Sequence, residues 1–243
     1  MSEEQKIALI TGANRGLGLE IARQLGKQHI TILLGTRNRE RGEAAASQLR
    51  ALGMDVIPLE LDVTNQASIE AAARLIEQTY GKLDILVNNA GTAVQGEETI
   101  PPSQLTGEDL RATMETNFFG AFAVSRAMLP LLRRSIAGRI VNMASEMGSL
   151  SIQSDPSTPL PPMLAYEASK AALNMLTILL AKELQQTPIK VNSVSPGYVS
   201  TDFTGHQGWL SVEQGAAVPV TYATLPADGP TGGFFGANGP IPW

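Results

Sequence analysis

Short apolar segments alternate along this chain with longer segments in which apolar residues recur every three or four positions. Ile7–Thr11 is a β-branched apolar run, and in the segment Gly16–Gln28 the residues Leu17, Ile21 and Leu25 recur at intervals of four. The first pattern predicts a buried strand, and the second predicts an amphipathic helix.

The same alternation continues through the rest of the chain. Further predicted strands are Thr31–Leu34, Val56–Leu61, Leu83–Val87, Ile140–Met143 and Val191–Val194, with Gly233-Phe234-Phe235 as a candidate last strand. Further predicted helices are Arg39–Leu52, Gln66–Tyr80, Leu105–Leu132 and a segment from about Ala165 to Gln186. Apolar strands separated by helices are typical of a parallel sheet that is covered on both faces. We therefore predict an α/β fold of three layers, a doubly wound parallel sheet of about seven strands with helices on both faces, in a single domain over residues 1–243.

One segment interrupts this alternation. Residues 153–163 contain Asp155-Pro156, Pro159 and Pro161-Pro162. Proline lacks a backbone N–H group, so neither a helix interior nor a central strand accepts it readily. The segment is predicted to be an extended surface loop directly before the helix that begins near Ala165.

Composition excludes several kinds of site. The chain has no cysteine, so disulfides and thiolate metal sites are excluded. His29 and His206 lie far apart in the sequence and no His, Asp and Glu cluster has metal-ligand spacing, so we expect no metal. The net charge of −5 argues against nucleic-acid binding. We interpret the basic cluster of Arg133-Arg134 with Arg139 as a solvated helix end.

The N-terminal segment bears on localisation. Met1–Lys6 is acidic, and the apolar run that follows stops at Gly12, so we expect no signal peptide. No stretch approaches the ~18 apolar residues that a membrane span needs. We expect a cytoplasmic protein with no membrane partner.

A glycine-rich loop, Thr11–Gly18, lies between the first predicted strand and helix. Glycines in this position allow a tight turn and a close approach of the backbone to a pyrophosphate, whose charge the helix N-terminus stabilises. The loop therefore predicts a dinucleotide cofactor. The residues that we expect to contact it are Gly12, Asn14, Arg15, Gly16, Leu17 and Gly18.

The end of the second predicted strand indicates which dinucleotide binds. An NAD-preferring site normally has a carboxylate there for the ribose 2′-hydroxyl. Here the strand ends in Gly35-Thr36-Arg37, without Asp or Glu, and Arg37 and Arg15 are placed to converge on a 2′-phosphate. We predict NADPH/NADP+ as the cofactor rather than NADH.

Tyr166 and Lys170 lie four residues apart in a predicted helix, and Ser145 follows a predicted strand. Residues at this spacing share one helix face. An ammonium group about 4 Å from a phenol supplies roughly the 4 kcal/mol needed to bring the phenol pKa near neutrality. Tyr166 is thus a candidate proton donor, with Ser145 as a hydrogen-bond donor to a carbonyl oxygen.

Taken together, these motifs resemble those of the short-chain dehydrogenase/reductase superfamily, in its standard-length branch, over essentially the whole chain. The matching motifs are Thr11–Gly18, Asp62-Val63, Asn88-Asn89-Ala90-Gly91, Thr116–Gly120, Ser145, Tyr166 with Lys170, and Pro196–Asp202. The resemblance implies a Rossmann fold, catalytic roles for Asn117, Ser145, Tyr166 and Lys170, and a proton relay in which Asn117 holds a water. It also implies that Lys170 bonds the nicotinamide ribose and that Asn88 mainly braces the sheet. Further implied cofactor contacts are Asp62, Val63, Asn89, Ala90, Gly91, Tyr166, Lys170, Pro196, Gly197, Val199 and Thr201.

Within the superfamily the chain is similar to the monomeric carbonyl reductases, although its insertion before Tyr166 is shorter than in the animal enzymes. The expected reaction is NADPH-dependent reduction of an aldehyde, ketone or quinone. A small apolar carbonyl substrate is expected, because the candidate pocket residues are Met147, Leu150, Met163, Leu164, Tyr198, Phe203 and Trp209. The sequence leaves open whether the protein is a monomer or a homo-oligomer.

Two other functions remain open at this point. One is a 3-ketoacyl thioester reductase of fatty-acid or polyketide type, for which Arg126, Arg133, Arg134 and Arg139 would form a basic rim for an acidic carrier. The other is a non-catalytic protein that binds NADPH as a sensor.

Overall fold

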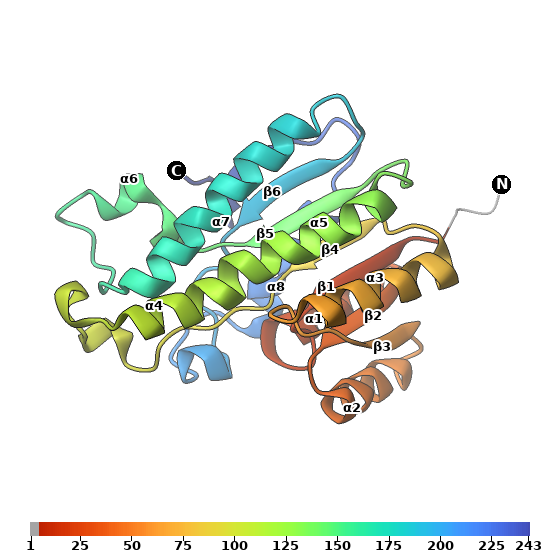
Figure 1. The fold of residues 1–243 in the computed structure, drawn as a ribbon, viewed down its shortest axis with the longest axis horizontal. Coiled ribbons are helices and arrows are strands. Elements are labelled where there is room, and N and C mark those ends of the chain that lie inside the picture. The colour runs from red at the N-terminus through yellow and green to blue at the C-terminus, as the bar shows by residue number, and fades with distance from the viewer. Residues whose placement is uncertain (1–4) are drawn as a thin grey trace.

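The computed structural model describes residues 5–243, and within them the strands join one eight-stranded sheet in the order β3-β2-β1-β4-β5-β6-β7-β8 (Figure 1). The strands are β1 (Ile7–Thr11), β2 (Thr31–Thr36), β3 (Val56–Glu60), β4 (Ile85–Asn88), β5 (Arg139–Met143), β6 (Lys190–Val194), β7 (Phe234–Gly236) and β8 (Gly239–Pro240). Neighbouring strands are parallel except β7 and β8, which are antiparallel. The predicted doubly wound α/β fold is confirmed. Most of the acidic segment Met1–Lys6 lies outside the described residues.

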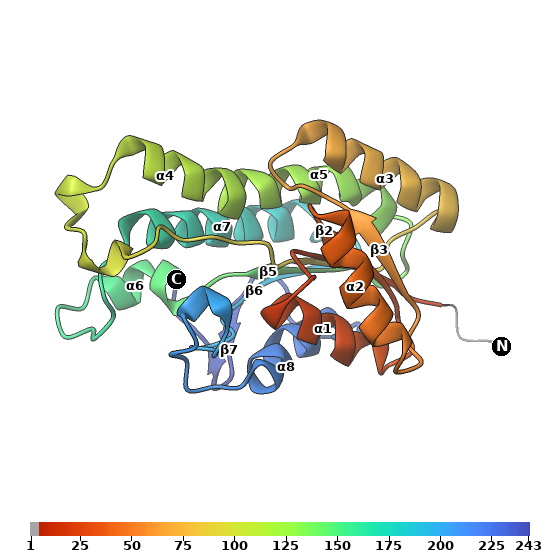
Figure 2. The same ribbon diagram turned by 90° about the horizontal axis from the view of Figure 1, so that it is seen from below.

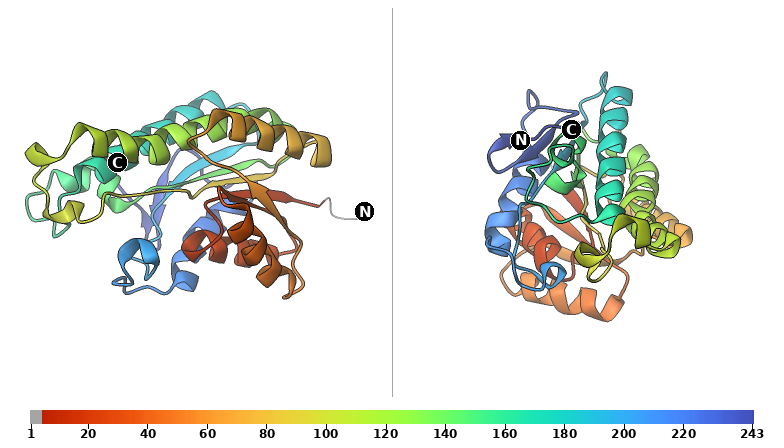
Figure 3. Two further views of the ribbon diagram at one scale, coloured as in Figure 1. Left: turned by 60° about the horizontal axis from the view of Figure 1, so that its bottom comes forward. Right: turned by 90° about the vertical axis from the view of Figure 1, so that its left-hand side faces the viewer.

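Helices cover both faces of the sheet (Figures 2 and 3). The larger helices are α1 (Gly16–Gly26), α2 (Arg39–Arg50), α3 (Gln66–Tyr80), α4 (Gly107–Met114), α5 (Ala121–Leu132), α7 (Leu164–Glu183) and α8 (Val212–Ala223). Alternate strand residues point to opposite faces. Ala8 and Ile10 therefore lie in a core with α1, α2 and α8, while Ile7 and Leu9 lie in a second core with α3, α5 and α7. Among residues 5–243, no helix is long and apolar enough to cross a membrane.

The predicted helix Leu105–Leu132 is divided in the structure. It consists of α4, a π-helical segment at Glu115–Gly120, and α5. The side chain of Thr106 caps α4 by accepting a hydrogen bond from Asp109 N. A π-helical turn inserts a residue into the helical ladder and is often found at a functional site.

The prediction for Arg139 was wrong. Arg139 begins β5 and is buried, with 3% of its surface exposed. Its guanidinium donates to the carbonyl oxygens of Leu225, Pro226, Gly138 and Pro188. Because a guanidinium has five donors, one buried arginine satisfies several loop carbonyls that would otherwise lack partners. Only Arg133 and Arg134 form the predicted solvated helix end.

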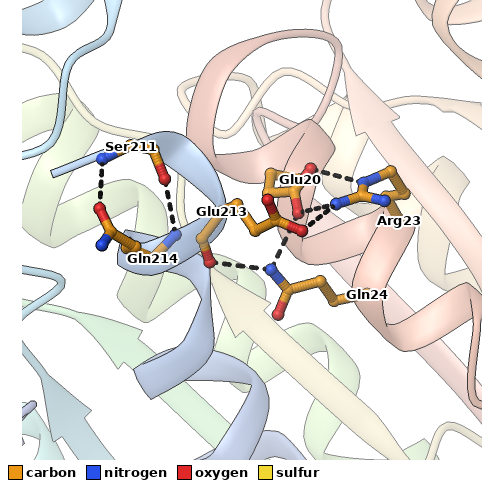
Figure 4. A network of polar contacts seen from close by, with 6 residues as sticks. All are labelled: Glu20, Arg23, Gln24, Ser211, Glu213 and Gln214. Carbon is orange, nitrogen blue, oxygen red and sulfur yellow. Dashed lines mark hydrogen bonds and ion pairs between the residues drawn. The ribbon is translucent and has the colours of Figure 1, made fainter.

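Polar side chains hold α8 against α1 (Figure 4). Arg23 donates to Glu20 and to Glu213, and Gln24 donates to Glu20 and to the Glu213 carbonyl. Burial raises the pKa of Glu20, but the hydrogen bonds from Arg23 and Gln24 outweigh that effect and lower it overall. Ser211 and Gln214 form a capping box at the start of α8. Sequence periodicity did not predict α8, which contains Pro219.

A row of buried polar side chains crosses the sheet interior. Asn88 Nδ2 donates to Asn142 Oδ1, at 2.8 Å, and to Ser125 Oγ. Asn142 Nδ2 donates to Thr177 Oγ1, which is also hydrogen-bonded to Ser193 Oγ. Asn88, Asn142 and Ser193 lie side by side in the register of β4, β5 and β6. The row therefore links three central strands to α5 and α7.

Candidate active site

The predicted site residues gather at one edge of the sheet. Because β1 to β7 are parallel, the loops that follow them leave from the same edge, away from the N-terminal end of the described chain (Figure 2). The strand order reverses between β1 and β4, and in open parallel sheets ligands bind at such a switch point. The glycine loop follows β1, and the segment Asn88–Gly91 ends β4 and continues into its loop.

The glycine loop fits a closely approaching ligand. Gly12 has a φ of 64° and Gly16 a φ of 55°, which L side chains rarely adopt. A Cβ at Gly18 would lie 2.5 Å from Asn89 Nδ2 and 2.7 Å from the Gly12 carbonyl oxygen, so a side chain there would push the loops apart. The loop runs into α1, whose N-terminus has no acidic residue in its first turn and no side-chain cap. The positive end of α1 is therefore available to an anion.

Thr11 joins the glycine loop to the loop after β4. Its hydroxyl oxygen accepts hydrogen bonds from the backbone N–H groups of Asn89 and Ala90, at 3.0 and 2.9 Å. The Asn89 side chain in turn donates to the carbonyl oxygens of Thr11 and Gly12. These contacts bring together the two loops on either side of the switch point.

A hollow of about 350 Å³, open to solvent, lies beside the glycine loop. Its lining comprises Asn14, Arg15, Arg41, Ala44, Ala45 and Gln48. The sequence pattern predicted Arg37, which is exposed at the end of β2, whereas the hollow is lined by Arg41 in the first turn of α2. Asn38 caps α2 by accepting from Arg41 N, so the sequence signals the start of this helix, but it does not signal that the Arg41 side chain faces Arg15. Arg15 and Arg41 therefore line the same hollow.

Arg15 also reaches across a second hollow, of about 360 Å³. Its Nη1 lies 2.7 Å from Asp202 Oδ2, and His206 Nε2 lies 3.0 Å from Asp202 Oδ1. A Cβ at Gly16 would lie 3.7 Å from Thr201 Cγ2, so the segment after β6 faces the start of α1. These contacts place Pro196–Asp202 opposite the glycine loop.

The other predicted cofactor residues lie at the same edge. Asp62, just after β3, is partly exposed and accepts from Thr64, while Val63 is buried. Beyond β6, Pro196 and Thr201 are partly exposed, Gly197 has a φ of 78°, and Val199 is buried. Leu17 is half-buried in the first turn of α1.

Ser145 follows β5 and begins a short 3-10 helix, Glu146–Gly148, where its hydroxyl oxygen accepts from Met147 N at 3.2 Å. This turn packs tightly on α7. A Cβ at Gly148 would lie 2.6 Å from Lys170 Cβ and 2.8 Å from the Lys170 carbonyl carbon. Glycine at position 148 therefore permits the approach that brings Ser145 beside the face of α7 that carries Tyr166 and Lys170.

Tyr166 and Lys170 share one face of α7, as predicted. Lys170 Nζ lies 5.4 Å from the centroid of the Tyr166 ring and donates to the Met143 carbonyl oxygen at 2.6 Å. Burial raises the pKa of Tyr166 to about 12, with hydrogen bonding to Ser145 acting in the opposite direction. Burial lowers the pKa of Lys170 to about 8. The predicted shift of the phenol pKa towards neutrality is absent in the protein alone.

Asn117 lies in the π-helical segment and is buried. Its Oδ1 accepts from Thr92 N, and its Nδ2 donates to the Thr92 carbonyl and to Ser169 Oγ. A Cβ at Gly91 would lie 3.5 Å from Asn117 Oδ1 and 3.7 Å from Lys170 Nζ. The loop after β4 therefore borders both Asn117 and Lys170.

One aromatic ring, that of Phe203, packs beside Tyr166, and two others pair with each other in the segment after β6. The Phe203 ring centroid lies 5.7 Å from that of Tyr166, and the Tyr198 and Trp209 rings are 5.0 Å apart. Phe203 and Trp209 are exposed, by 52% and 79%. Leu164 and Leu150 are also exposed, at 39% and 72%. Exposed apolar groups of this size beside polar groups are characteristic of a binding site for an apolar ligand.

Comparisons with known proteins agree with this geometry. The family model for short chain dehydrogenases matches residues 6–208. The (-)-isopiperitenone reductase of Mentha piperita is 34% identical over 97% of this chain and 97% of its own length. The NADPH carbonyl reductase 1 of Mus musculus is 32% identical over 100% of both chains.

Solved structures show the same similarity. The NADPH-bound carbonyl reductase from chicken fatty liver has a TM-score of 0.85 and 26% identity, over 98% of this chain and 99% of that chain. Salutaridine reductase from Papaver somniferum has a TM-score of 0.83 and 29% identity, over 96% of this chain and 100% of that chain.

Proposed function

This chain belongs to the short-chain dehydrogenase family of oxidoreductases, and from that premise we propose that it reduces aldehyde, ketone or quinone carbonyls to alcohols with NADPH. The observation that carries the proposal is the convergence of Ser145, Tyr166 and Lys170 beside the loop Asn89–Gly91. That loop is hydrogen-bonded to the glycine loop through Thr11. The acid–base groups and the glycine loop therefore lie at the same edge of the sheet, joined by the loop after β4.

The residues present fit a dinucleotide. Gly12 and Gly18 allow the glycine loop to pack against Asn89 and Ala90, and the uncapped positive end of α1 that follows suits a pyrophosphate. Arg15 and Arg41 line one hollow, and two guanidinium groups suit a 2′-phosphate better than a 2′-hydroxyl. We assign the adenine side to Asp62 and Val63, and the nicotinamide side to Pro196, Gly197, Val199 and Thr201. Arg37 remains a proposed contributor at the end of β2.

In the proposed mechanism, bound NADPH supplies a hydride to the carbonyl carbon. The Ser145 hydroxyl, whose oxygen accepts from Met147 N, lies beside the Tyr166 phenol and would donate a hydrogen bond to the carbonyl oxygen of the substrate. Tyr166 remains a neutral phenol at pH 7 and gives its proton to that oxygen as negative charge develops there. The ammonium of Lys170 then stabilises the phenolate. Asn117 holds the loop at Thr92 in place and belongs to the proposed proton relay.

The exposed apolar residues support a small apolar carbonyl substrate. Phe203 packs beside the Tyr166 ring, and Trp209 packs beside Tyr198. The relatives named (-)-isopiperitenone reductase and NADPH carbonyl reductase 1 are consistent with this class. A ring-shaped or long-chain ketone would replace water at these side chains and so bind favourably.

Three of the four arginines of the basic rim expected for the thioester-reductase alternative are buried or paired, while Arg126 is exposed on α5. Arg139 is buried at the start of β5, which is the end of that strand opposite Ser145. Arg133 and Arg134 are paired with Glu183 and Glu77. An acidic carrier would therefore meet little free positive charge from these arginines.

An NADPH-oxidation screen tests the proposal. The panel contains aldehydes, quinones, apolar ketones and ketoacyl thioesters, with NADH assayed in parallel. We expect turnover with apolar carbonyls and a higher kcat/KM for NADPH than for NADH. Equal or better kcat/KM with NADH would overturn the cofactor assignment. Retained NADPH binding without oxidation by any member would instead identify a non-catalytic binding protein.

A further inference from the structure

A buried glutamate far from α7 in the sequence supplies that helix with a cap. Glu97 lies in the loop between β4 and α4 and is only 1% exposed. Its Oε1 accepts a hydrogen bond of 2.5 Å from Ala165 N. Ala165 is the second residue of α7 and directly precedes Tyr166. The contact therefore joins residues 68 positions apart beside the proposed proton donor.

The N-terminus of α7 needs this contact because it lacks a cap of its own. The residue before the helix, Met163, makes no side-chain capping hydrogen bond. The first N–H groups of a helix have no partner within it, and a buried helix end requires partners from elsewhere. Glu167 Oε1 accepts a hydrogen bond from Met163 N, and Glu97 Oε1 accepts one from Ala165 N.

The chemistry of Glu97 is unusual for a residue that only packs a loop. Its second oxygen, Oε2, is buried without a hydrogen-bond partner among the described residues. Burying a carboxylate with an oxygen left unsatisfied is unfavourable, and an apolar side chain would fill the same space without that cost. Glu97 also lies near Glu167, whose pKa is raised chiefly by burial and further by the charge of Glu97. Its benefit must therefore come from the helix end that it contacts.

A second buried contact ties the same loop to α7 one turn further along. Asn117 holds Thr92 through two hydrogen bonds and donates to Ser169 Oγ. Ser169 in turn donates to the Tyr166 carbonyl oxygen. The contacts at Ala165 and Ser169 therefore bracket Tyr166, and both hold the loop that follows the proposed cofactor-binding segment Asn89–Gly91.

We propose that Glu97 is a positioning residue that caps α7 and fixes the place of Tyr166 relative to the substrate carbonyl. This inference rests on the proposed function, since it concerns the same proton donor. Negative charge at a helix N-terminus is stabilising, so the carboxylate holds the first turn closed. A displacement of about 1 Å at a reacting group is enough to lower a rate by 100-fold.

The test compares three variants with the wild-type protein. Glu97→Ala removes the cap and is expected to lower kcat by about 10- to 100-fold, with the dissociation constant of NADPH within about twofold of wild type. Glu97→Gln keeps an oxygen that accepts from Ala165 N and should restore most of kcat. The matched control is Glu98→Ala, which removes the same charge from an exposed neighbour and should leave kcat unchanged.

Hydrogen exchange gives a readout that does not depend on turnover. The peptide that contains Ala165 and Tyr166 should exchange faster in Glu97→Ala than in wild type, and at nearly the wild-type rate in Glu97→Gln. If Glu97→Ala does not fold, Glu97→Leu takes its place, because leucine keeps the bulk and removes the acceptor.

Unchanged exchange, or a kcat in Glu97→Ala within twofold of wild type, would overturn the inference. A kcat in Glu97→Gln as low as that in Glu97→Ala would also overturn it. If the wild-type protein turns over no carbonyl at all, the proposed function fails instead, and the exchange data still report on the cap.

Discussion

At the scale of single residues, burial lowers the pKa of Lys170 to about 8 and raises that of Tyr166 to about 12, so Tyr166 is a protonated phenol at neutral pH. Spacing predicted correctly that Lys170 shares a helix face with it. Spacing could not predict that burial would dominate the pKa of both groups, or that Nζ would bond the Met143 carbonyl. A phenol with a pKa of about 12 keeps its proton until an alkoxide, a far stronger base, develops beside it. This suits a proton donor in the direction of reduction.

Replacing the phenol hydroxyl tests that role. Tyr166→Phe removes the proton donor and leaves the ring, so kcat should fall by about 100- to 10,000-fold. NADPH affinity, measured by fluorescence titration, should stay near the wild-type value. Tyr80→Phe, at the end of α3, is the control and should be fully active. Near-normal turnover in Tyr166→Phe would remove Tyr166 from the mechanism.

The buried amine of Lys170 should reduce stability at neutral pH. Its pKa in the folded protein, about 8, lies below the usual 10.5, so below pH 8 folding must bury a charge. A difference of this size corresponds to about 3 kcal/mol. Lys170→Met removes that cost and also a hydrogen bond worth about 1 kcal/mol. At pH 7 the variant should therefore be inactive yet more stable by about 2 kcal/mol.

The stability difference between Lys170→Met and the wild type should change with pH in one defined direction. As pH rises from about 8 to 10.5, the folded wild type releases the proton while the unfolded chain keeps it, so the wild type gains stability relative to Lys170→Met. Denaturant unfolding at pH 7 and pH 10 measures the change. Lys182→Met, exposed on the same helix, should show no such dependence. A stability difference that does not vary with pH would contradict the assignment.

At the scale of elements, periodicity predicted the strands and helices that alternate regularly. Gln66–Tyr80 was predicted with the observed bounds, and most other ends differ by a few residues. Periodicity missed α8, because Pro219 and small residues weaken its pattern, although Ser211 and Gln214 gave a capping-box signal. The π-helical turn around Asn117 depends on contacts with Thr92 and Ser169, which sequence spacing does not contain.

The close contact between the Ser145 turn and α7 gives a prediction for Gly148. In Gly148→Ala the new Cβ would meet the Lys170 backbone, so the turn must move away and Ser145 with it. We expect kcat to fall by about 10- to 100-fold while NADPH affinity is retained. Steady-state kinetics and a cofactor titration measure both. In the control, Gly107→Ala, the new Cβ meets only the flexible end of Arg111, and kcat should not change.

At the scale of the whole molecule, Arg139 connects segments that lie far apart in the sequence. Burial lowers the pKa of Arg139, but its donors reach carbonyl oxygens in the segments before β5, before β6 and after α8. Arg139→Met would leave these carbonyls without partners and lower the free energy of unfolding by about 2–4 kcal/mol. Denaturant unfolding measures this loss. Arg126→Met, exposed on α5, is the control and should cost less than about 0.5 kcal/mol.

The two-sided burial of the sheet has a further consequence for how its strands align. A slip of one residue would turn every side chain to the opposite face, but both faces are apolar here, and a slip of two residues would preserve even the facing pattern. Apolar side chains alone therefore discriminate only weakly between the possible registers of neighbouring strands. The row of Asn88, Asn142 and Ser193 removes this ambiguity. If one of these strands shifted its register, a buried amide side chain would lose its hydrogen-bond partner. These hydrogen bonds therefore fix the register of β4, β5 and β6. The positions of the loops that follow these strands, which carry the predicted site residues, depend on that register.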